Sequence, residues 1–156
     1  MRPPAQYADI IREHQKKHPV KLSSLAKELD IVVKITDLSD DISGQLYLDK
    51  DTKKWKILVN RRHSKQRQRF TLAHEIAHWL LHRDELTSGK LQDDSFYRST
   101  LSDQREREAN QLAADILMPW KTIQQLTKQG YTTPEELAAA LDVSLPAISA
   151  RLGLPT

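Results

Sequence analysis

Apolar residues recur three and four residues apart over most of this chain, with polar residues between them. This spacing is typical of helices that bury one face. It predicts helices over 5–17, 21–29, 103–118, 134–141 and 145–152, and a further one that ends near Gly130.

Three short segments follow a different pattern. Residues 31–36 are mostly β-branched, residues 45–48 alternate in polarity, and residues 55–59 are mainly apolar. These patterns favour strands. The polar stretch 49–54 lies between the last two and suits the loop of a hairpin, so we expect three short strands.

The longest helical candidate runs from Ser64 to about His82 and contains neither glycine nor proline. Its apolar stripe includes Ile76, Trp79 and Leu80. Histidines and a glutamate lie among these apolar positions, so this helix is the first candidate for a functional site.

The segment after that helix, residues 84–102, has no clear period and contains Ser88-Gly89. It is predicted to be a loop that edges or covers a cleft, or else a spacer. Asp103 is expected to cap the next helix, and Pro119 to end it.

Together these elements predict an α+β fold, in which a small three-stranded sheet packs on the long helix and on the helix over 103–118. A length of 156 residues suits one compact core with at most a small addition. We expect a main domain over 1–130 and a C-terminal subdomain over 131–156 that packs on it.

The last two predicted helices resemble a helix-turn-helix. Thr133 and Glu136 form a capping box, and 142–144 is a short turn before the second helix. That helix offers only Ser149 and Arg151 as contacts to bases or phosphates, which is sparse for a recognition helix. Packing or substrate docking is therefore favoured over DNA binding.

The long helix carries the sequence His-Glu-Ile-Ala-His at 74–78. Residues four apart lie on one face about 6 Å apart along the axis, so His74 and His78 can converge on one metal ion. Glu75 projects about 100° away from His74, close enough to hold a metal-bound water. The pattern predicts a zinc peptidase in which Glu75 takes a proton from the attacking water.

Two histidines leave a catalytic zinc one ligand short. His82 lies about 12 Å along the axis from His74, too far to share the ion, and is expected to be a surface histidine or a neighbour of the ligands. Asp84 stands where an extended form of the motif has its third ligand. That form needs a glycine where this chain has Leu81.

The helix over 103–118 supplies the preferred third ligand, Glu106. Glu108 is the alternative, because it points about 200° away from Glu106 and the rotation of the helix is unknown. Asn110, one turn after Glu106, is expected to accept a hydrogen bond from the outer ring nitrogen of a ligand histidine. His63 and Tyr97 are candidates to stabilise the oxyanion if their loops reach the metal.

Composition excludes several classes of protein. The chain has no cysteine, so disulfides, zinc fingers and thiol nucleophiles are ruled out, and histidine and carboxylate must hold any metal. No apolar run approaches the ~18 residues of a membrane helix, and we expect a cytoplasmic protein with no membrane partner.

The formal net charge of +3 is a weak indication of a nucleic-acid partner. More notable is a basic cluster at the start of the long helix, where positive charge opposes the helix dipole. It is expected to pair with nearby acidic residues or, as the alternative, to bind an acidic or nucleic-acid partner. The cluster consists of Arg61, Arg62, Lys65, Arg67 and Arg69.

With these residues in view, the chain resembles the ImmA/IrrE family of metallopeptidases over about 22–152. Residues 67–78 resemble the family's active-site helix, and 106–119 resemble its second signature. Leu112 departs from the phenylalanine that is frequent in the family, and no functional residue is affected. The resemblance implies that Glu106 is the third metal ligand. It also implies a cytoplasmic bacterial or mobile-element protease that cleaves a helix-turn-helix repressor.

The predicted function is therefore that of a zinc-dependent endopeptidase, with manganese as the alternative metal. The expected partner is a protein substrate, a helix-turn-helix transcriptional repressor. The rival hypothesis is a regulatory module that holds metal and binds a repressor or DNA without cleaving anything.

Overall fold

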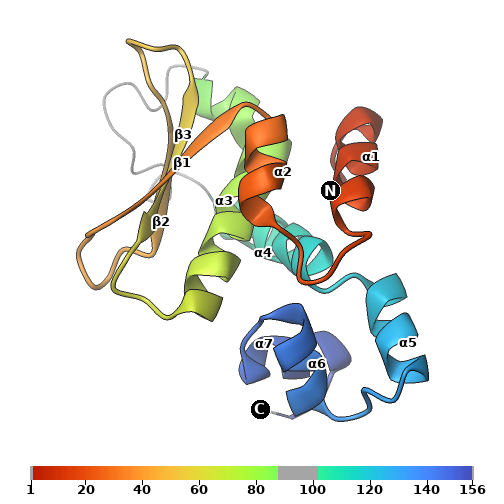
Figure 1. The fold of residues 1–156 in the computed structure, drawn as a ribbon. Helices are drawn as coiled ribbons and strands as arrows, with labels where there is room; N and C mark the ends of the chain where they lie inside the picture. The colour runs from red at the N-terminus through yellow and green to blue at the C-terminus, as the bar shows by residue number, and fades with distance from the viewer. Residues whose placement is uncertain (1, 88–101, 156) are drawn as a thin grey trace.

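The computed structural model describes residues 2–87 and 102–155. Within them the chain forms seven helices and one three-stranded sheet (Figure 1). The elements are α1 (Ala5–His14), α2 (Leu22–Glu28), β1 (Ile31–Thr36), β2 (Gly44–Leu48), β3 (Trp55–Asn60), α3 (Lys65–Thr87), α4 (Asp103–Leu117), α5 (Trp120–Lys128), α6 (Pro134–Leu141) and α7 (Leu145–Leu152).

The sheet has the strand order β1-β3-β2. β1 runs parallel to β3, with Ile31 opposite Trp55, and β2 runs antiparallel to β3, with Gly44 opposite Val59. The predicted hairpin loop is present, because Asp49 donates its backbone N–H to the carbonyl of Lys54. Among the described residues β2 is an edge strand with β3 as its neighbour, although it lies between β1 and β3 in the sequence.

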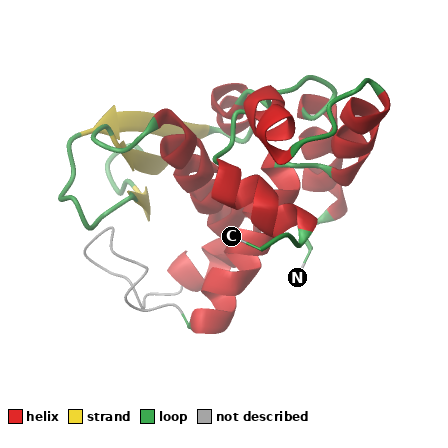
Figure 2. Ribbon diagram, turned by 90° about the horizontal axis from the view of Figure 1, so that it is seen from below, coloured by secondary structure: helices red, strands yellow, loops and turns green. Residues whose placement is uncertain are grey.

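Helix α3 occupies the middle of the molecule, with the sheet on one side and helices on the other (Figures 1 and 2). Ser64 starts it by accepting a hydrogen bond from the backbone N–H of Arg67. Every residue from 73 to 80 is buried. A helix buried on all sides is normally apolar all round, and the polar residues inside this one need a partner.

Two predicted helix ends are wrong: α1 ends at His14 and not at 17, and α3 does not end near His82. α3 continues to Thr87 instead of ending near His82, because Arg83 and Leu86 still pack inward. Arg83 donates to the carbonyl of Trp79 and to the hydroxyl of Tyr7, which ties α1 to α3.

The cap of α4 is Ser102 and not Asp103. The Ser102 hydroxyl accepts from the backbone N–H of Arg105, and Asp103 sits in the first turn. A carboxylate there still favours the helix, since it faces the positive end of the dipole.

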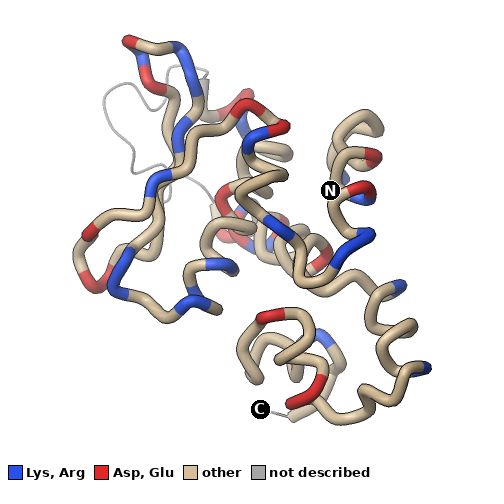
Figure 3. The backbone as a smooth tube through the Cα atoms, viewed as in Figure 1, with Lys and Arg blue, Asp and Glu red and all other residues tan. Residues whose placement is uncertain are grey.

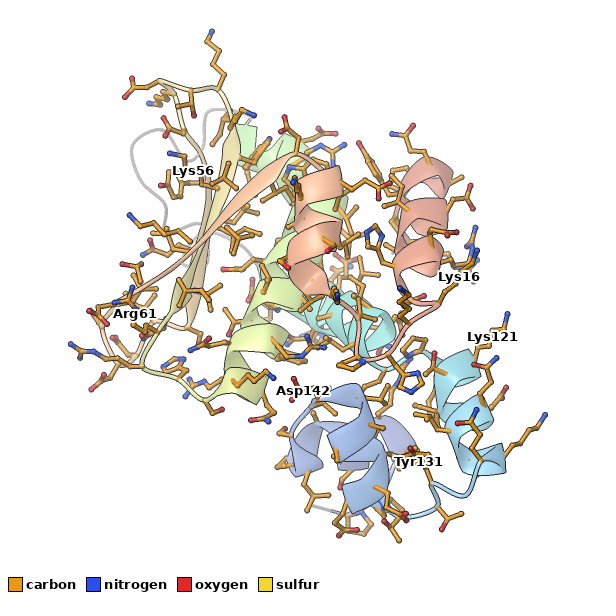
Figure 4. All side chains as sticks on the ribbon, viewed as in Figure 1. Lys16, Lys56, Arg61, Lys121, Tyr131 and Asp142 are labelled. Carbon is orange, nitrogen blue, oxygen red and sulfur yellow. The ribbon has the colours of Figure 1, made fainter. Side chains whose placement is uncertain are left out.

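The C-terminal helices α6 and α7 pack on the rest of the chain. The capping box of Thr133 and Glu136 is formed as predicted. Asp142, in the turn after α6, pairs with Lys65 and accepts from Gln66, and its backbone carbonyl accepts from Arg69. Figure 4 shows Asp142 between the start of α3 and the α6–α7 pair.

The α+β fold class is confirmed, with the small sheet and the motif helix in contact. In the part of the chain that the structure describes, no helix is both long enough and apolar enough to cross a membrane.

Candidate metal centre

The two histidines of the motif lie one helical turn apart on α3. Both are buried, His78 completely, and their ring centroids are 4.6 Å apart. Glu106, from α4, faces both of them: one carboxylate oxygen is 3.3 Å from His74 Nε2 and the other is 2.8 Å from His78 Nε2. Three potential metal donors thus converge from two helices.

Glu75 is the second carboxylate at this place. It is completely buried, and its carboxylate oxygen lies within 4.8 Å of the donor nitrogens of His74 and His78. Two carboxylates thus flank the imidazoles, Glu106 from α4 and Glu75 from α3. A metal-activated water needs one carboxylate as a ligand and another as a base beside it.

The protonation states of His78 and Glu106 suit the binding of a cation. Burial lowers the pKa of His78 to about 4, although Glu106 opposes the change. Burial would raise the pKa of Glu106, but its contacts with His74 and His78 outweigh burial and hold that pKa well below its usual range. At neutral pH the site therefore presents neutral imidazole and ionised carboxylate, the forms that bind a divalent metal.

A buried chain of contacts leads away from His78. His82 is buried, its Nδ1 lies 2.9 Å from His78 Nδ1, and its Nε2 lies 3.0 Å from an oxygen of Glu108. Glu108 also accepts from Arg105, which pairs in turn with Glu85. The prediction that His82 lies beside a histidine of the motif is confirmed, and the alternative that it lies on the surface is wrong.

The other predicted site residues lie elsewhere. Glu108, the alternative ligand, contacts His82 and not the motif histidines. Asp84 is exposed on α3. Asn110 is exposed on α4 and does not make the expected hydrogen bond to a ligand histidine, because α4 turns it toward solvent. Tyr97 lies outside the described residues.

His63 is also placed away from the histidines. It sits in the turn before α3, where its Nε2 lies 3.3 Å from the carbonyl of Asp40 and 3.4 Å from the amide of Asn60. Since α3 begins at Lys65, His74 is about 14 Å farther along the helix axis. The oxyanion role of His63 stays a prediction.

The family model described as the IrrE N-terminal-like domain, a peptidase family, matches residues 26–153. The chain belongs to this family. The resemblance identified from the sequence is thereby confirmed, and with it a metallopeptidase-type domain and a candidate site for a divalent metal.

Two further likenesses accompany the family match. The "Radiation response metalloprotease IrrE" of Deinococcus deserti is 42% identical over 91 residues, which are 56% of this chain and 32% of that protein. This chain thus corresponds to about a third of its relative. A solved "Mycobacterium tuberculosis transcriptional regulator" matches with a TM-score of 0.63 and 20% identity, over 95% of this chain and 46% of that one. This second likeness concerns the fold alone.

In this IrrE-like domain the basic cluster is largely paired within the chain. Arg61 lies 3.8 Å from Asp37, and Arg62 lies 3.4 Å from Asp40. Lys65 and Arg69 both pair with Asp142, and Arg67 donates to the hydroxyl of Ser43. Figure 3 shows basic residues at the start of α3 with acidic residues on neighbouring segments. The prediction that nearby acidic residues offset this cluster is confirmed for four of its members.

The two side chains that could have contacted DNA point inward in the same IrrE-like domain. Ser149 is buried. Arg151 donates to the backbone carbonyl of Met118, pairs with Asp115 and lies over the ring of Trp120. Neither side chain is presented for base or phosphate contacts, which favours the packing interpretation of α7.

Proposed function

We propose that this chain is a zinc-dependent endopeptidase in which His74, His78 and Glu106 hold the metal. The observation that carries the proposal is the convergence of Glu106 on both imidazoles, at 3.3 and 2.8 Å, in a buried part of the molecule. Zinc suits three ligands of this kind with one position left open, and manganese is the alternative. Membership of a peptidase family supports the choice of reaction.

The residues of the chain would divide the work as follows. The bound metal would acidify a water and polarise the scissile carbonyl. Glu75 would accept the proton of the attacking water and deliver it to the leaving amine. Its complete burial beside the two histidines would hold the carboxylate in one place and keep bulk water from competing for that proton.

The edge strand β2 is the place where we expect the substrate. Among the described residues β2 pairs with β3 alone. Its first residue, Gly44, lies so close to α3 that an added Cβ would stand 3.4 Å from the carboxylate of Glu75. An extended peptide that adds to β2 as a further strand would therefore lie close to Glu75.

The substrate we propose is a helix-turn-helix repressor, as the family resemblance implies, and the reaction would take place in the cytoplasm, where such a repressor acts. Cleavage would relieve repression. The relative from Deinococcus deserti is named for a radiation response, and a protease that removes a repressor is compatible with that name.

A Glu75→Gln variant tests the enzyme against the rival, a regulatory module that holds metal without cleaving. The amide keeps the size of the side chain but cannot accept the proton. We expect peptide cleavage to fall by about 10²- to 10⁴-fold with metal content unchanged. Cleavage would be followed on a repressor encoded beside the protein's gene, and metal by elemental analysis. Full biological output from a metal-loaded Glu75→Gln protein would favour the rival.

A further inference from the structure

Arg67 is the one member of the basic cluster that has no carboxylate partner among the described residues. The other four members each pair with an aspartate. The Arg67 side chain is exposed, and one nitrogen of its guanidinium donates to the hydroxyl of Ser43 at 3.2 Å. A guanidinium has five N–H donors, so this bond leaves most of them open to a ligand. The positive charge of Arg67 is therefore available for a negatively charged partner.

Arg67 lies on the face of α3 that carries the proposed catalytic groups. Arg67, Thr71 and Glu75 follow one another at intervals of four residues, which places them side by side along the helix. His74 comes seven residues after Arg67, in nearly the same direction around the axis and about 10 Å farther along it. The free charge thus stands two helical turns before the candidate metal centre.

The start of β2 runs along this same face of α3, with which β2 is in contact (Figure 1). Ser43 contacts Arg67, and the next residue, Gly44, lies against Thr71 and Glu75. A Cβ added to Gly44 would stand 2.6 Å from the methyl group of Thr71 and 3.4 Å from the carboxylate of Glu75. Two consecutive residues of the chain therefore connect the position of Arg67 with that of Glu75.

A peptide that adds to the free edge of β2 would pass both positions. An extended strand advances about 3.3 Å per residue, so the 10 Å between Arg67 and His74 correspond to about three residues of peptide. A side chain of that length from the scissile bond, on the side that extends toward Ser43, would come within reach of the guanidinium.

We propose that Arg67 is a specificity-determining residue, which binds the carboxylate of an aspartate or glutamate about three residues from the scissile bond of the substrate. A guanidinium and a carboxylate can form two parallel hydrogen bonds, a geometry that a neutral amide does not match. The inference rests on the proposed function, because β2 and Glu75 define where the peptide lies.

Two substitutions separate recognition of a charge from a structural role of the same side chain. Arg67→Gln removes the charge, and Ser43→Ala removes the hydroxyl that Arg67 binds but keeps the charge. If Arg67 does no more than tie the chain before β2 to α3, the two variants will behave alike. Arg62→Gln is the control for loss of an exposed positive charge, because Arg62 already pairs with Asp40.

The probe is a set of internally quenched peptides. One peptide that the zinc-loaded protein cleaves is selected from a random pool, and its scissile bond is located by mass spectrometry. Glu, Gln and Lys are then placed in turn at each position up to four residues from that bond. The measured quantity is the ratio of kcat/KM for the Glu peptide to that for the Gln peptide on the same protein, which cancels any change in the folded fraction.

We expect the unaltered protein to favour Glu over Gln by about 5- to 10-fold at one position close to the third from the bond. Ser43→Ala and Arg62→Gln should keep this ratio, and Arg67→Gln should bring it close to one. Arg67→Glu should favour Lys over Glu at the same position. A ratio of one in the unaltered protein, a ratio that survives in Arg67→Gln, or an equal loss in Ser43→Ala would overturn the proposal.

Binding of the same peptides, labelled with a fluorophore and followed by anisotropy, distinguishes this inference from the proposed function. If the protein binds peptide without cleaving it, the proposed reaction fails, and the ratio of the dissociation constants of the Gln and Glu peptides decides the role of Arg67. Cleavage with no preference for Glu overturns the role of Arg67 alone. A protein that neither binds nor cleaves any peptide of the pool would overturn both.

Discussion

The α3–α4 pair and the α6–α7 pair both turn polar side chains inward, with different results. In α3–α4, His74, His78 and Glu106 face one another around a common point. In α6–α7, the inward Arg151 donates to a backbone carbonyl and pairs with one carboxylate.

The two helix pairs differ in what their inward polar side chains contact. A polar side chain that binds the backbone satisfies an atom the fold has already buried, and so contributes to stability. Imidazoles and a carboxylate that converge on one point concentrate donor atoms there, which is how a ligand site is built. Substitutions in α3–α4 are therefore expected to act mainly on metal binding, and those in α6–α7 mainly on stability.

The largest expected effect is that of Glu106→Ala on metal binding. Removing one of three ligands should take zinc content from about one ion per chain to near zero, and cleavage should vanish with it. Elemental analysis of the purified protein measures the first and a cleavage assay the second. The metal-free variant should unfold at a somewhat lower urea concentration, because the contacts with His74 and His78 that hold the pKa of Glu106 low favour the folded state at neutral pH.

Glu108→Ala is the matched control, two residues further along α4. Since Glu108 contacts His82 and not the motif histidines, this variant should retain metal at saturating zinc. Loss of metal from Glu108→Ala together with full occupancy in Glu106→Ala would transfer the ligand role to Glu108.

In the α6–α7 pair we expect a substitution to lower stability and to leave metal binding unchanged. The Arg151 side chain is 6% exposed, and Arg151→Met would leave the buried carbonyl of Met118 without its donor. The free energy of unfolding should fall by about 1–3 kcal/mol, with zinc affinity unchanged. Urea denaturation of the metal-free protein measures the loss.

The exposed Lys128, at the end of α5, provides the control for that experiment. Lys128→Met makes a similar chemical change on the surface and should leave the free energy of unfolding within about 0.5 kcal/mol. A drop in zinc affinity in Arg151→Met would show that the two helix pairs are coupled, and the comparison between them would then fail.

The smallest effect is expected from Asn110→Ala. Asn110 follows Glu106 by one turn, yet its side chain is exposed and does not reach a ligand histidine. Zinc affinity should change by less than about twofold. A competitive zinc titration of the variant and of the unaltered protein checks this, and a tenfold loss would show that Asn110 supports the metal site.

Elements that depend on local signals were predictable from the sequence. α6 and α7 have the expected bounds, because Thr133 and Pro134 define one start and Ser144 and Pro146 the other. The motif pair His74 and His78 also follows from helix geometry alone. One local signal misled the prediction: Ser102 and Asp103 are both good caps and adjacent, so composition could not choose between them.

Features that depend on packing between elements were not predictable. The alternation in β2 indicates a strand but not its neighbour, so the order β1-β3-β2 and the edge beside Glu75 came only from the structure. The contact between His82 and Glu108 depends on how α4 is rotated against α3. For the same reason the sequence left Glu106 and Glu108 as alternative ligands. It also predicted a hydrogen bond from a ligand histidine to Asn110, whereas the rotation of α4 turns Asn110 toward solvent.

The proposed ligands come from two helices that are far apart in the sequence, and this has a consequence for the unfolded chain. A metal bound by His78 and Glu106 would act as a reversible cross-link, closing a loop of 106 − 78 = 28 residues. Because unfolding separates these ligands and releases the metal, binding would stabilise the folded chain by mass action, by about 2.7 kcal/mol when free zinc stands at 100 times its dissociation constant. Metal loading would then govern how long the folded molecule persists as well as whether it can cleave a peptide.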